Sequence, residues 1–278
     1  MTLDAPGTAA RAAASPRISV IVPSYNSGAF LRQALTSALD QVPPPCEVVV
    51  QDGGSTDDTL DILRSFGERV AWISERDGGQ ADALNKGLAR ASGDVVLLLN
   101  ADDVILPGSL AAATAAFELD RDLAFAYGDF DMIDGAGALV RRYRSSRYSW
   151  ERVYARGCYI FIGSLFVRRQ VLMEIGGFDA SLRACMDFDL LLRLDGNRRS
   201  MHLRRTIGQF RMHDSSKSST IGSVFIREAF RVRRRYARRS LRLWLVAVWL
   251  MPLFAVTLLT SRLRYSPRWP RHGRGKTL

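Results

Sequence analysis

A short apolar run that ends in two carboxylates constrains the fold of this chain more than any other feature. Five apolar residues, 95–99, are followed directly by Asn100-Ala101-Asp102-Asp103. A run this short and apolar predicts a strand that is buried on both faces. In open α/β sheets, ligands bind beyond the carboxyl ends of the strands. The run therefore predicts an α/β sheet with Asp102 and Asp103 at its ligand-binding edge.

The two aspartates have two interpretations. Adjacent carboxylates repel each other and are most stable beside a cation, and oxygen ligands suit Mg²⁺ or Mn²⁺. In the other interpretation, the two residues form an acidic turn that caps a helix beginning near Ser109. These residues alone leave both interpretations open.

Strand and helix patterns alternate along the chain. The predicted strands are residues 18–22, 47–50, 70–74, 95–99, 125–127, 160–167 and 207–212. The predicted helices are residues 29–41, 59–66, 80–91, 169–175 and 187–194, with 141–152 as a loop or a short helix. This alternation predicts right-handed βαβ units and a mainly parallel central sheet flanked by helices. Because both halves are needed to enclose a site, we treat residues 17–220 as one domain.

Cysteine usage and the amino-terminal segment bear on the compartment. Cys46, Cys158 and Cys185 are far apart and odd in number, with neither a metal spacing nor a disulfide framework. This predicts a reducing compartment and buried thiols.

Residues 1–16 lack the apolar core of a signal peptide and are expected to form a disordered leader. We therefore expect the globular part to stay in the cytosol.

Three predicted strands of the first hundred residues end in polar turns. The turns are Pro23-Ser24-Tyr25-Asn26, Asp52-Gly53-Gly54-Ser55 and Asn100-Ala101-Asp102-Asp103. Parallel strands bring these ends to one edge, where the first two turns can hold a base and a ribose, and the third a metal on the phosphates. Each turn taken alone is more typical of an ordinary connection between a strand and a helix. The sequence has neither a Walker A motif nor Gly-x-Gly-x-x-Gly, which argues against P-loop NTPases and Rossmann dinucleotide enzymes.

Four motifs, in order, resemble those of family 2 glycosyltransferases with the GT-A fold. They are residues 18–26 (ISVIVPSYN), 51–57 (QDGGSTD), 78–87 (GGQADALNKG) and 99–103 (LNADD). The resemblance implies transfer of a sugar from a nucleotide diphosphate sugar, usually with inversion and with a divalent metal, Mn²⁺ or Mg²⁺. It also implies roles for particular residues: Pro23, Tyr25, Asn26 and Asp52 line the nucleoside pocket, and Gln80 and Asp82 lie near the base or the sugar.

Two positions depart from the family pattern. Asn100 stands where many relatives carry the first aspartate of an Asp-x-Asp metal motif. The resemblance therefore implies that Asp102 is the main metal ligand, with Asn100 at the donor and Asp103 at the donor sugar or in the metal's water shell. Gly53 stands where many relatives carry a second aspartate, which leaves Asp52 as the only carboxylate of that turn.

Inverting transfer also needs a carboxylate that removes a proton from the acceptor hydroxyl. Met186-Asp187-Phe188-Asp189 resembles the Glu-Asp motif of the family, with Met186 in place of the glutamate, and Asp187 matches the base position. Asp189 lies roughly 200° further around a helix and faces elsewhere. In the alternative interpretation, Asp187 is a carboxylate at a helix N-terminus, stabilised by the helix dipole.

A histidine near the end of the predicted domain is a second candidate metal ligand. His213 follows Phe210-Arg211-Met212, and this segment resembles the late Arg-x-His element of the family. The resemblance implies a further metal ligand or a diphosphate contact. Without it, a lone histidine in a polar loop is more typical of a solvated side chain.

The basic charge is concentrated toward the carboxyl-terminal end. Residues 225–278 contain 14 lysines and arginines against one acidic residue, whereas the preceding part has 25 basic and 27 acidic residues. Within residues 221–242, Phe225, Ala229, Val232 and Tyr236 share one helical face, and most arginines lie on the other. This pattern predicts an amphipathic helix on an anionic membrane.

A long uncharged segment follows this helix. Residues 243–260 carry no charge and include Trp244, Trp249 and Pro252. As a helix they would span about 27 Å, the lower limit for a bilayer. Crossing would place the basic tail 262–278 outside, against the positive-inside tendency. We favour a kinked, membrane-embedded segment (243–261) over a true span, and a core helix is the other alternative. The uncharged run makes nucleic acid the poorer interpretation of the basic residues.

Together with the resemblance, these patterns imply an inverting hexosyl- or N-acetylhexosaminyl-transferase with a nucleotide diphosphate sugar donor, a UDP-sugar being favoured. The expected acceptor is a hydroxyl of a lipid-linked or polysaccharide glycan, at the cytoplasmic face of the cell membrane. Two alternatives stay open. One is a sugar-phosphate nucleotidyltransferase, which releases pyrophosphate. The other is a non-catalytic, membrane-bound module that binds nucleotide sugars.

Overall fold

The computed structural model describes residues 15–213, 216, 222–237, 245 and 248–249. The strands are β1 (Ile18–Ser24), β2 (Glu47–Asp52), β3 (Ala71–Ser74), β4 (Val95–Leu98), β5 (Val104–Ile105), β6 (Phe125–Asp134), β7 (Leu139–Tyr143), β8 (Leu165–Arg168) and β9 (Ser200–Met212). The helices are α1 (Gly28–Leu39), α2 (Thr59–Ser65), α3 (Gln80–Arg90), α4 (Ser109–Leu119), α5 (Trp150–Arg156), α6 (Arg169–Glu174), α7 (Met186–Arg193) and α9 (Gly222–Tyr236). Two short 3₁₀ helices are η1 (Gly67–Arg69) and η2 (Ile162–Ser164).

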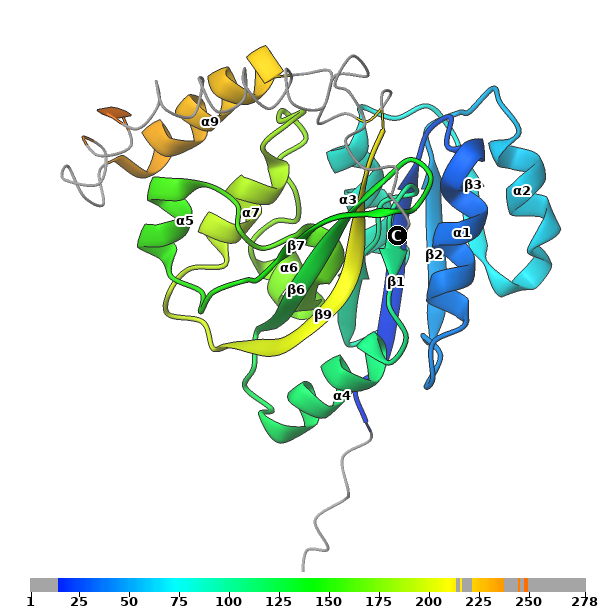
Figure 1. Ribbon diagram of the computed structural model, residues 1–278, viewed down its shortest axis with the longest axis horizontal. Helices are drawn as coiled ribbons and strands as arrows, with labels where there is room; N and C mark the ends of the chain where they lie inside the picture. Colours follow the sequence, from blue (N-terminus) through cyan, green and yellow to red (C-terminus); the bar gives the residue numbers. More distant parts are fainter. Residues whose placement is uncertain (1–14, 214–215, 217–221, 238–244, 246–247, 250–278) are drawn as a thin grey trace, which may run out of the picture.

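One sheet runs through the described part of the chain (Figure 1), in the order β3-β2-β1-β4-β8-β6-β9-β5, with β7 paired to β6. Strands β1 to β4 pair in parallel, as the sequence predicts. Beyond β4 the sheet is mixed, because β8 is antiparallel to both β4 and β6, and β5 is antiparallel to β9. The prediction of a mainly parallel sheet is therefore correct only for the first half.

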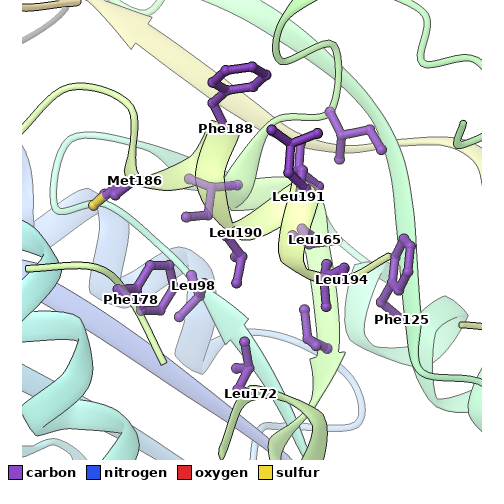
Figure 2. Packing of buried hydrophobic residues seen from close by; sticks show 14 of the residues in the cluster. Leu98, Phe125, Leu165, Leu172, Phe178, Met186, Phe188, Leu190, Leu191 and Leu194 are labelled. Carbon is purple, nitrogen blue, oxygen red and sulfur yellow. The ribbon is translucent and has the colours of Figure 1, made fainter. Parts of the chain in front are cut away.

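Strand β4 is buried on both faces, as its sequence predicts. Val96 and Leu98 contribute to the apolar cluster under α3, α5, α6 and α7, whereas Val95 and Leu97 contribute to the cluster under α1, α2 and α4. Figure 2 shows the first cluster, with Leu98 of β4 near Phe178 and side chains from α7 above the sheet. Because helices cover both faces, only the edges and the strand ends of this half of the sheet remain open for a ligand.

Two other sequence expectations are wrong. Residues 139–143 form strand β7 instead of a loop, because antiparallel pairing with β6 satisfies their backbone hydrogen bonds. Only the end of the 141–152 segment is helical, where α5 begins. The second concerns the thiols. Cys46 is exposed, whereas Cys185 is buried; the Cys158 residue as a whole is exposed, but its thiol group is buried.

Helix α9 forms where the sequence predicts an amphipathic helix, but its apolar face packs on the protein itself. Ala229 and Val232 are buried in the same cluster as residues of α5 and α7, and Phe225 and Tyr236 pack against it. Figure 1 shows α9 beside α5 and α7. The expectation that this face lies on a membrane is therefore wrong, because protein side chains cover it. The expected boundary at residue 220 does not separate this helix from the core.

Most of the predicted membrane-embedded segment 243–261 lies outside the described residues, as do residues 1–14 of the expected leader. Of that segment, Leu245, Val248 and Trp249 are described, and their side chains are exposed. Among the helices of the described part, none is both long enough and apolar enough to cross a membrane.

Candidate active site

The carboxyl ends of β1, β2 and β4 lie at one edge of the sheet. In the paired registers, Ser24 of β1 lies opposite Asp52 of β2, and Ile21 of β1 lies opposite Leu98 of β4. Strand β9 reaches the same edge because β5, which follows Asp103 directly, pairs with β9 through Val104 and Gln209. This pairing places the turn after β4 beside the end of β9.

Asp102 and His213 meet at this edge. Asp102 Oδ2 and His213 Nε2 are 3.1 Å apart, and the two side chains are 29% and 16% exposed. The His213 ring lies against Phe30 of α1, with the ring centroids 4.6 Å apart. Carboxylate oxygens suit Mg²⁺ and Mn²⁺, and imidazole is a common ligand of first-row metals. The pair therefore fits a divalent metal, with Mn²⁺ favoured by the nitrogen ligand.

Asp103 has the opposite environment from its neighbour. Its carboxylate is fully buried and accepts hydrogen bonds from the backbone N–H of Arg211 (2.9 Å) and from Nδ2 of Asn100 (2.7 Å). Burial and the nearby charge of Asp102 raise the pKa of Asp103 well above its ordinary value. Because the carboxylate faces the protein interior, we no longer assign Asp103 to the donor sugar or to the metal's water shell. It fixes the turn to β9 instead.

Arg211 is the residue of this site to which sequence reasoning gave no role. It is 2% exposed, and its guanidinium donates to the carbonyl oxygens of Asp102 (2.8 Å) and Asp134 (3.2 Å) and to Oε1 of Gln33 (2.7 Å). It also lies over the Phe30 ring. A buried charge is stable only when it is fully hydrogen-bonded. The Arg-x-His pattern was the available signal in the sequence. The burial of Arg211, however, depends on partners that are far away in sequence.

Asn100 and Gln80 are brought together by the fold. Gln80, the first residue of α3, donates from Nε2 to Oδ1 of Asn100 at 2.6 Å. Since Asn100 also donates to Asp103, these side chains link α3 to the turn after β4. Their contact with a donor stays a prediction.

Asp52 is enclosed in the turn after β2. Its Oδ2 accepts hydrogen bonds from the backbone N–H groups of Gly54 (3.1 Å) and Ser55 (2.9 Å) and from the Ser74 hydroxyl (2.6 Å). Its Oδ1 accepts from the Ser55 hydroxyl, and the residue is fully buried. The carboxylate therefore holds the turn together and joins it to β3. We no longer assign it a contact with the nucleobase.

The turn after β1 is tied to the turn after β2. Asn26 has a left-handed backbone (φ 48°), a conformation that asparagine tolerates better than most residues. Its Oδ1 accepts from the Thr56 N–H at 2.9 Å, and its own N–H donates to the Ser55 hydroxyl at 2.8 Å. Tyr25 projects outward and is 64% exposed, whereas Pro23 is buried in β1. Of these predicted nucleoside residues, Tyr25 and Asn26 are exposed to a ligand, whereas Pro23 and Asp52 are buried.

Asp82 lies in the first turn of α3. Its Oδ2 accepts from the N–H of Gly78 (2.9 Å) and lies 3.6 Å from Nζ of Lys86, which also pairs with Glu75. The carboxylate is 32% exposed. It closes the loop before α3, and its contact with a base or sugar stays a prediction.

Asp187 lies in the first turn of α7, at the end of the loop that follows α6. Its Oδ1 accepts from the N–H of Phe188 at 2.7 Å, and it remains partly exposed. Burial of the Cys158 thiol and the nearby Asp187 carboxylate raise the pKa of Cys158, which places this thiol beside the candidate base. Asp189 faces elsewhere, as predicted. It is buried and pairs with Arg193 at 2.7 Å.

Glu228 of α9 is a second residue that sequence reasoning missed. Its carboxylate is buried and accepts hydrogen bonds from three consecutive backbone N–H groups, those of Arg183 (2.9 Å), Ala184 (2.8 Å) and Cys185 (3.1 Å). These residues lead directly into α7. Glu228 therefore fixes the segment that positions Asp187. It is the sole acidic residue in a very basic stretch, and this was the available signal.

Comparison with known proteins gives the family. The family model described as glycosyl transferase family 2 matches residues 19–183. The chain belongs to glycosyltransferase family 2. A PGL/p-HBAD biosynthesis glycosyltransferase of Mycobacterium tuberculosis is 32% identical over 194 residues, which cover 66% of this chain and 72% of that protein. An uncharacterised glycosyltransferase of Rickettsia prowazekii is 30% identical over 63% of this chain, and the aligned region spans only 58% of the relative.

Solved structures show that this family 2 glycosyltransferase has the GT-A fold. Staphylococcus aureus TarS (residues 1–349) in complex with UDP-GlcNAc gives a TM-score of 0.61 at 23% identity, covering 78% of this chain and 65% of that one. The mannosyltransferase PcManGT of Pyrobaculum calidifontis, in complex with GDP-Man and Mn²⁺, gives 0.59 at 21% identity, covering 91% and 76%. Membership of the family favours glycosyl transfer over the nucleotidyltransferase and binding-module alternatives.

Proposed function

We propose that this glycosyltransferase transfers a sugar, with inversion, from a nucleoside diphosphate sugar to a hydroxyl of a lipid-linked or polysaccharide acceptor. A UDP-sugar is the favoured donor. The observation that carries the proposal is the pairing of Asp102 with His213 at the edge where β1, β2 and β4 end. The binding of UDP-GlcNAc by TarS and of GDP-Man by PcManGT supports a nucleotide-sugar donor.

Asp102 and His213 would hold Mn²⁺ or Mg²⁺. In the described part of the chain, no group of three or more acidic, histidine or cysteine side chains gathers around one point. A two-residue site leaves room for donor oxygens, so metal and donor would bind together. When bound, the metal offsets the negative charge that grows on the leaving diphosphate.

Asp187 is the proposed general base. The acceptor oxygen forms a bond to the anomeric carbon while the bond from that carbon to the diphosphate breaks, and the hydroxyl proton moves to the Asp187 carboxylate. The carboxylate is partly exposed at the start of α7. Its Oδ1 accepts a local hydrogen bond from the N–H of Phe188.

We also infer that the chain acts at the cytosolic face of a membrane. Two features support this. Arg227, Arg231 and Arg234 are exposed on the outward face of α9, opposite the face that packs on the core. The exposed Leu245 and Trp249 belong to the uncharged segment that follows. Arginines attract anionic lipid headgroups, and tryptophans favour the interface.

Hydrolysis of nucleotide sugars tests the proposed reaction. Purified full-length protein, given Mn²⁺ and a panel of nucleotide sugars, is expected to release the nucleoside diphosphate slowly, with no pyrophosphate. Asp102→Ala should weaken metal-dependent donor binding, because it removes the only carboxylate of the ligand pair. The measurement is a Mn²⁺ titration of donor binding by calorimetry. An unchanged titration would contradict the metal assignment, and Asp122→Asn, in an exposed turn, is the control.

A further inference from the structure

The carboxylate at the end of β2, Asp52, is fully engaged within the protein. Asp52 is fully buried, and four donors of the protein use both of its oxygens. A ligand would have to displace one of these hydrogen bonds to contact it. A carboxylate that contacts the base at this edge must therefore belong to another residue.

Asp77 fills the space beside Asp52. A Cβ atom built on Gly53 would lie only 2.9 Å from Oδ2 of Asp77 and 3.2 Å from its Cγ. Gly53 does not have a positive φ, so its backbone would accept other residues. A side chain at position 53 would have to displace the carboxylate of Asp77, which lies against the Gly53 backbone.

The two oxygens of Asp77 differ in their partners. Oδ1 accepts a hydrogen bond at 2.8 Å from the N–H of Gly79, the residue directly before α3. Within the described residues, no donor reaches Oδ2, and the side chain is partly exposed. A carboxylate oxygen thus remains available at the end of β3, next to the turn after β2.

The position suits the base end of a nucleotide. Neighbouring strands lie about 4.8 Å apart, so β2 is roughly 10 Å from β4, across β1. This separation leaves space for a ribose and a diphosphate between Asp77 and the Asp102–His213 pair. The exposed Tyr25 ring lies on the turn after β1, between these two positions in the strand order.

We propose that Oδ2 of Asp77 accepts a hydrogen bond from a ring N–H of the donor's nucleobase, and that this contact selects the base. The inference rests on the proposed function. Uracil offers N3–H and guanine offers N1–H, whereas N3 of cytosine and N1 of adenine carry no hydrogen. Asp77 therefore favours UDP- and GDP-sugars over CDP- and ADP-sugars, whose ring nitrogen would turn a lone pair toward the carboxylate. It supplies the carboxylate that Gly53 lacks.

Asp77→Asn separates this role from the contact with the Gly79 N–H. The asparagine Oδ1 can still accept from Gly79, while its Nδ2 takes the place of Oδ2 and turns an acceptor into a donor. UDP affinity is expected to fall about tenfold or more, because the uracil N3–H would face a donor and lose its hydrogen-bond acceptor. CDP affinity should rise, because N3 of cytosine is an acceptor. The measurement is calorimetry of UDP, GDP and CDP with Mn²⁺ on the full-length protein.

Two controls keep the test independent of folding. Glu75→Gln makes the same carboxylate-to-amide change two residues away, at an exposed side chain paired with Lys86, and should leave the UDP-to-CDP ratio unchanged. N3-methyl-UDP tests the unaltered protein: the methyl group removes the N3–H, so its binding should be about tenfold weaker than that of UDP.

A rescue experiment moves the carboxylate to the neighbouring turn. Gly53→Asp combined with Asp77→Ala should restore the preference for UDP.

The outcomes distinguish the two proposals. If the unaltered protein binds none of the three nucleoside diphosphates, the proposed function fails. If it binds UDP or GDP but Asp77→Asn leaves the base preference unchanged, or if N3-methyl-UDP binds as well as UDP, only the role of Asp77 is overturned. A preference of the unaltered protein for CDP would overturn it as well.

Discussion

Asp102 and Asp103 are adjacent in sequence but have opposite environments. Asp102 reaches the surface beside His213, whereas Asp103 is buried under the backbone of Arg211. Asp103 directly precedes β5, whose pairing with β9 brings the backbone N–H of Arg211 to its carboxylate, whereas Asp102 lies in the turn before it. One aspartate is therefore available for a metal, and the other fixes the metal-binding turn to β9.

At the scale of the single residue, Asp187 offers the sharpest prediction. Asp187→Asn keeps the size of the side chain and its hydrogen bond from Phe188, but it cannot remove a proton from the acceptor. The turnover number is expected to fall about 10²- to 10⁴-fold, the usual contribution of general base catalysis. Donor binding, measured by calorimetry with Mn²⁺, should not change.

The matched control is Asp195→Asn, which lies outside the proposed site, just after α7. It should leave both turnover and donor binding unaltered. Full turnover by Asp187→Asn would refute the base assignment. A parallel loss of donor binding would instead place Asp187 in the donor site.

Local motifs identify some residues of the site, whereas other residues acquire their roles only in the folded chain. Asp102 and His213 were recognisable because their motifs are local and ordered along the chain. Asp77 and Arg211 were not, because their roles depend on residues in other strands: Gly53 beneath Asp77, and Gln33, Asp102 and Asp134 around Arg211. Whether a charged side chain is buried depends on these distant partners.

At the scale of the element, α9 is part of the catalytic body. It contributes Ala229 and Val232 to the core, and Arg233 donates from Nε to the carbonyl oxygen of Tyr154 at 2.9 Å. Arg233 also lies over the Phe188 ring of α7. The amphipathic pattern predicted the helix and its inner face correctly, but could not show whether lipid or protein covers that face. A lipid surface and a protein core both favour the same apolar stripe along a helix.

Glu228→Gln tests the connection from α9 to the candidate base. The substitution replaces one acceptor oxygen by an N–H₂ group that faces backbone N–H donors. We expect a loss of about 2 kcal/mol in unfolding free energy, together with lower turnover because the start of α7 shifts. Chemical denaturation and kinetic assays check the two effects. Glu174→Gln, at an exposed glutamate paired with Arg198, is the control. Normal turnover in Glu228→Gln would contradict a positioning role.

A second prediction at this scale concerns the pH dependence of the contact between α9 and the loop before α7. Burial opposes ionisation of Asp179, but hydrogen bonds from Ser181 and Arg235 outweigh it and lower its pKa to about 2. The unfolded value is about 3.9. The contact therefore stabilises the fold above about pH 4, and this contribution is lost as the pH falls toward 2.

Asp179→Asn should accordingly destabilise the protein near neutral pH, and the difference from the unaltered protein should shrink on acidification. Urea unfolding at several pH values measures it. A difference that is independent of pH would show that Asp179 contributes through packing alone.

At the scale of the whole molecule, the second half of the chain completes the site of the first. The turn after β4 acquires its partners only because β9 returns to the same edge, and Asp187 acquires its position only because α9 packs beside α7. The charge is divided in the same way. The first 224 residues are close to neutral, whereas the outer face of α9 and the residues beyond it are strongly basic.

Membrane binding is the prediction that belongs to this scale. The full-length protein should sediment with vesicles that contain anionic phosphatidylglycerol, and high salt should weaken this binding by screening the arginines. Replacing Arg227, Arg231 and Arg234 by glutamine should reduce it, while Arg64→Gln, on the exposed side of α2, should not. Protein that stays wholly in the supernatant at low salt would contradict anchoring.

The sequence by itself determined the family, the parallel first half of the sheet, the buried strand β4 and the order of the motifs at its edge. These follow from local periodicity and from residues close together in the chain. Only the tertiary structure decided that Asp103 and Asp52 are internal, that Asp77 occupies the space over Gly53, and that protein covers the apolar face of α9. Each of these depends on contacts between segments far apart in sequence, where burial and hydrogen-bond partners fix the role of a charged group.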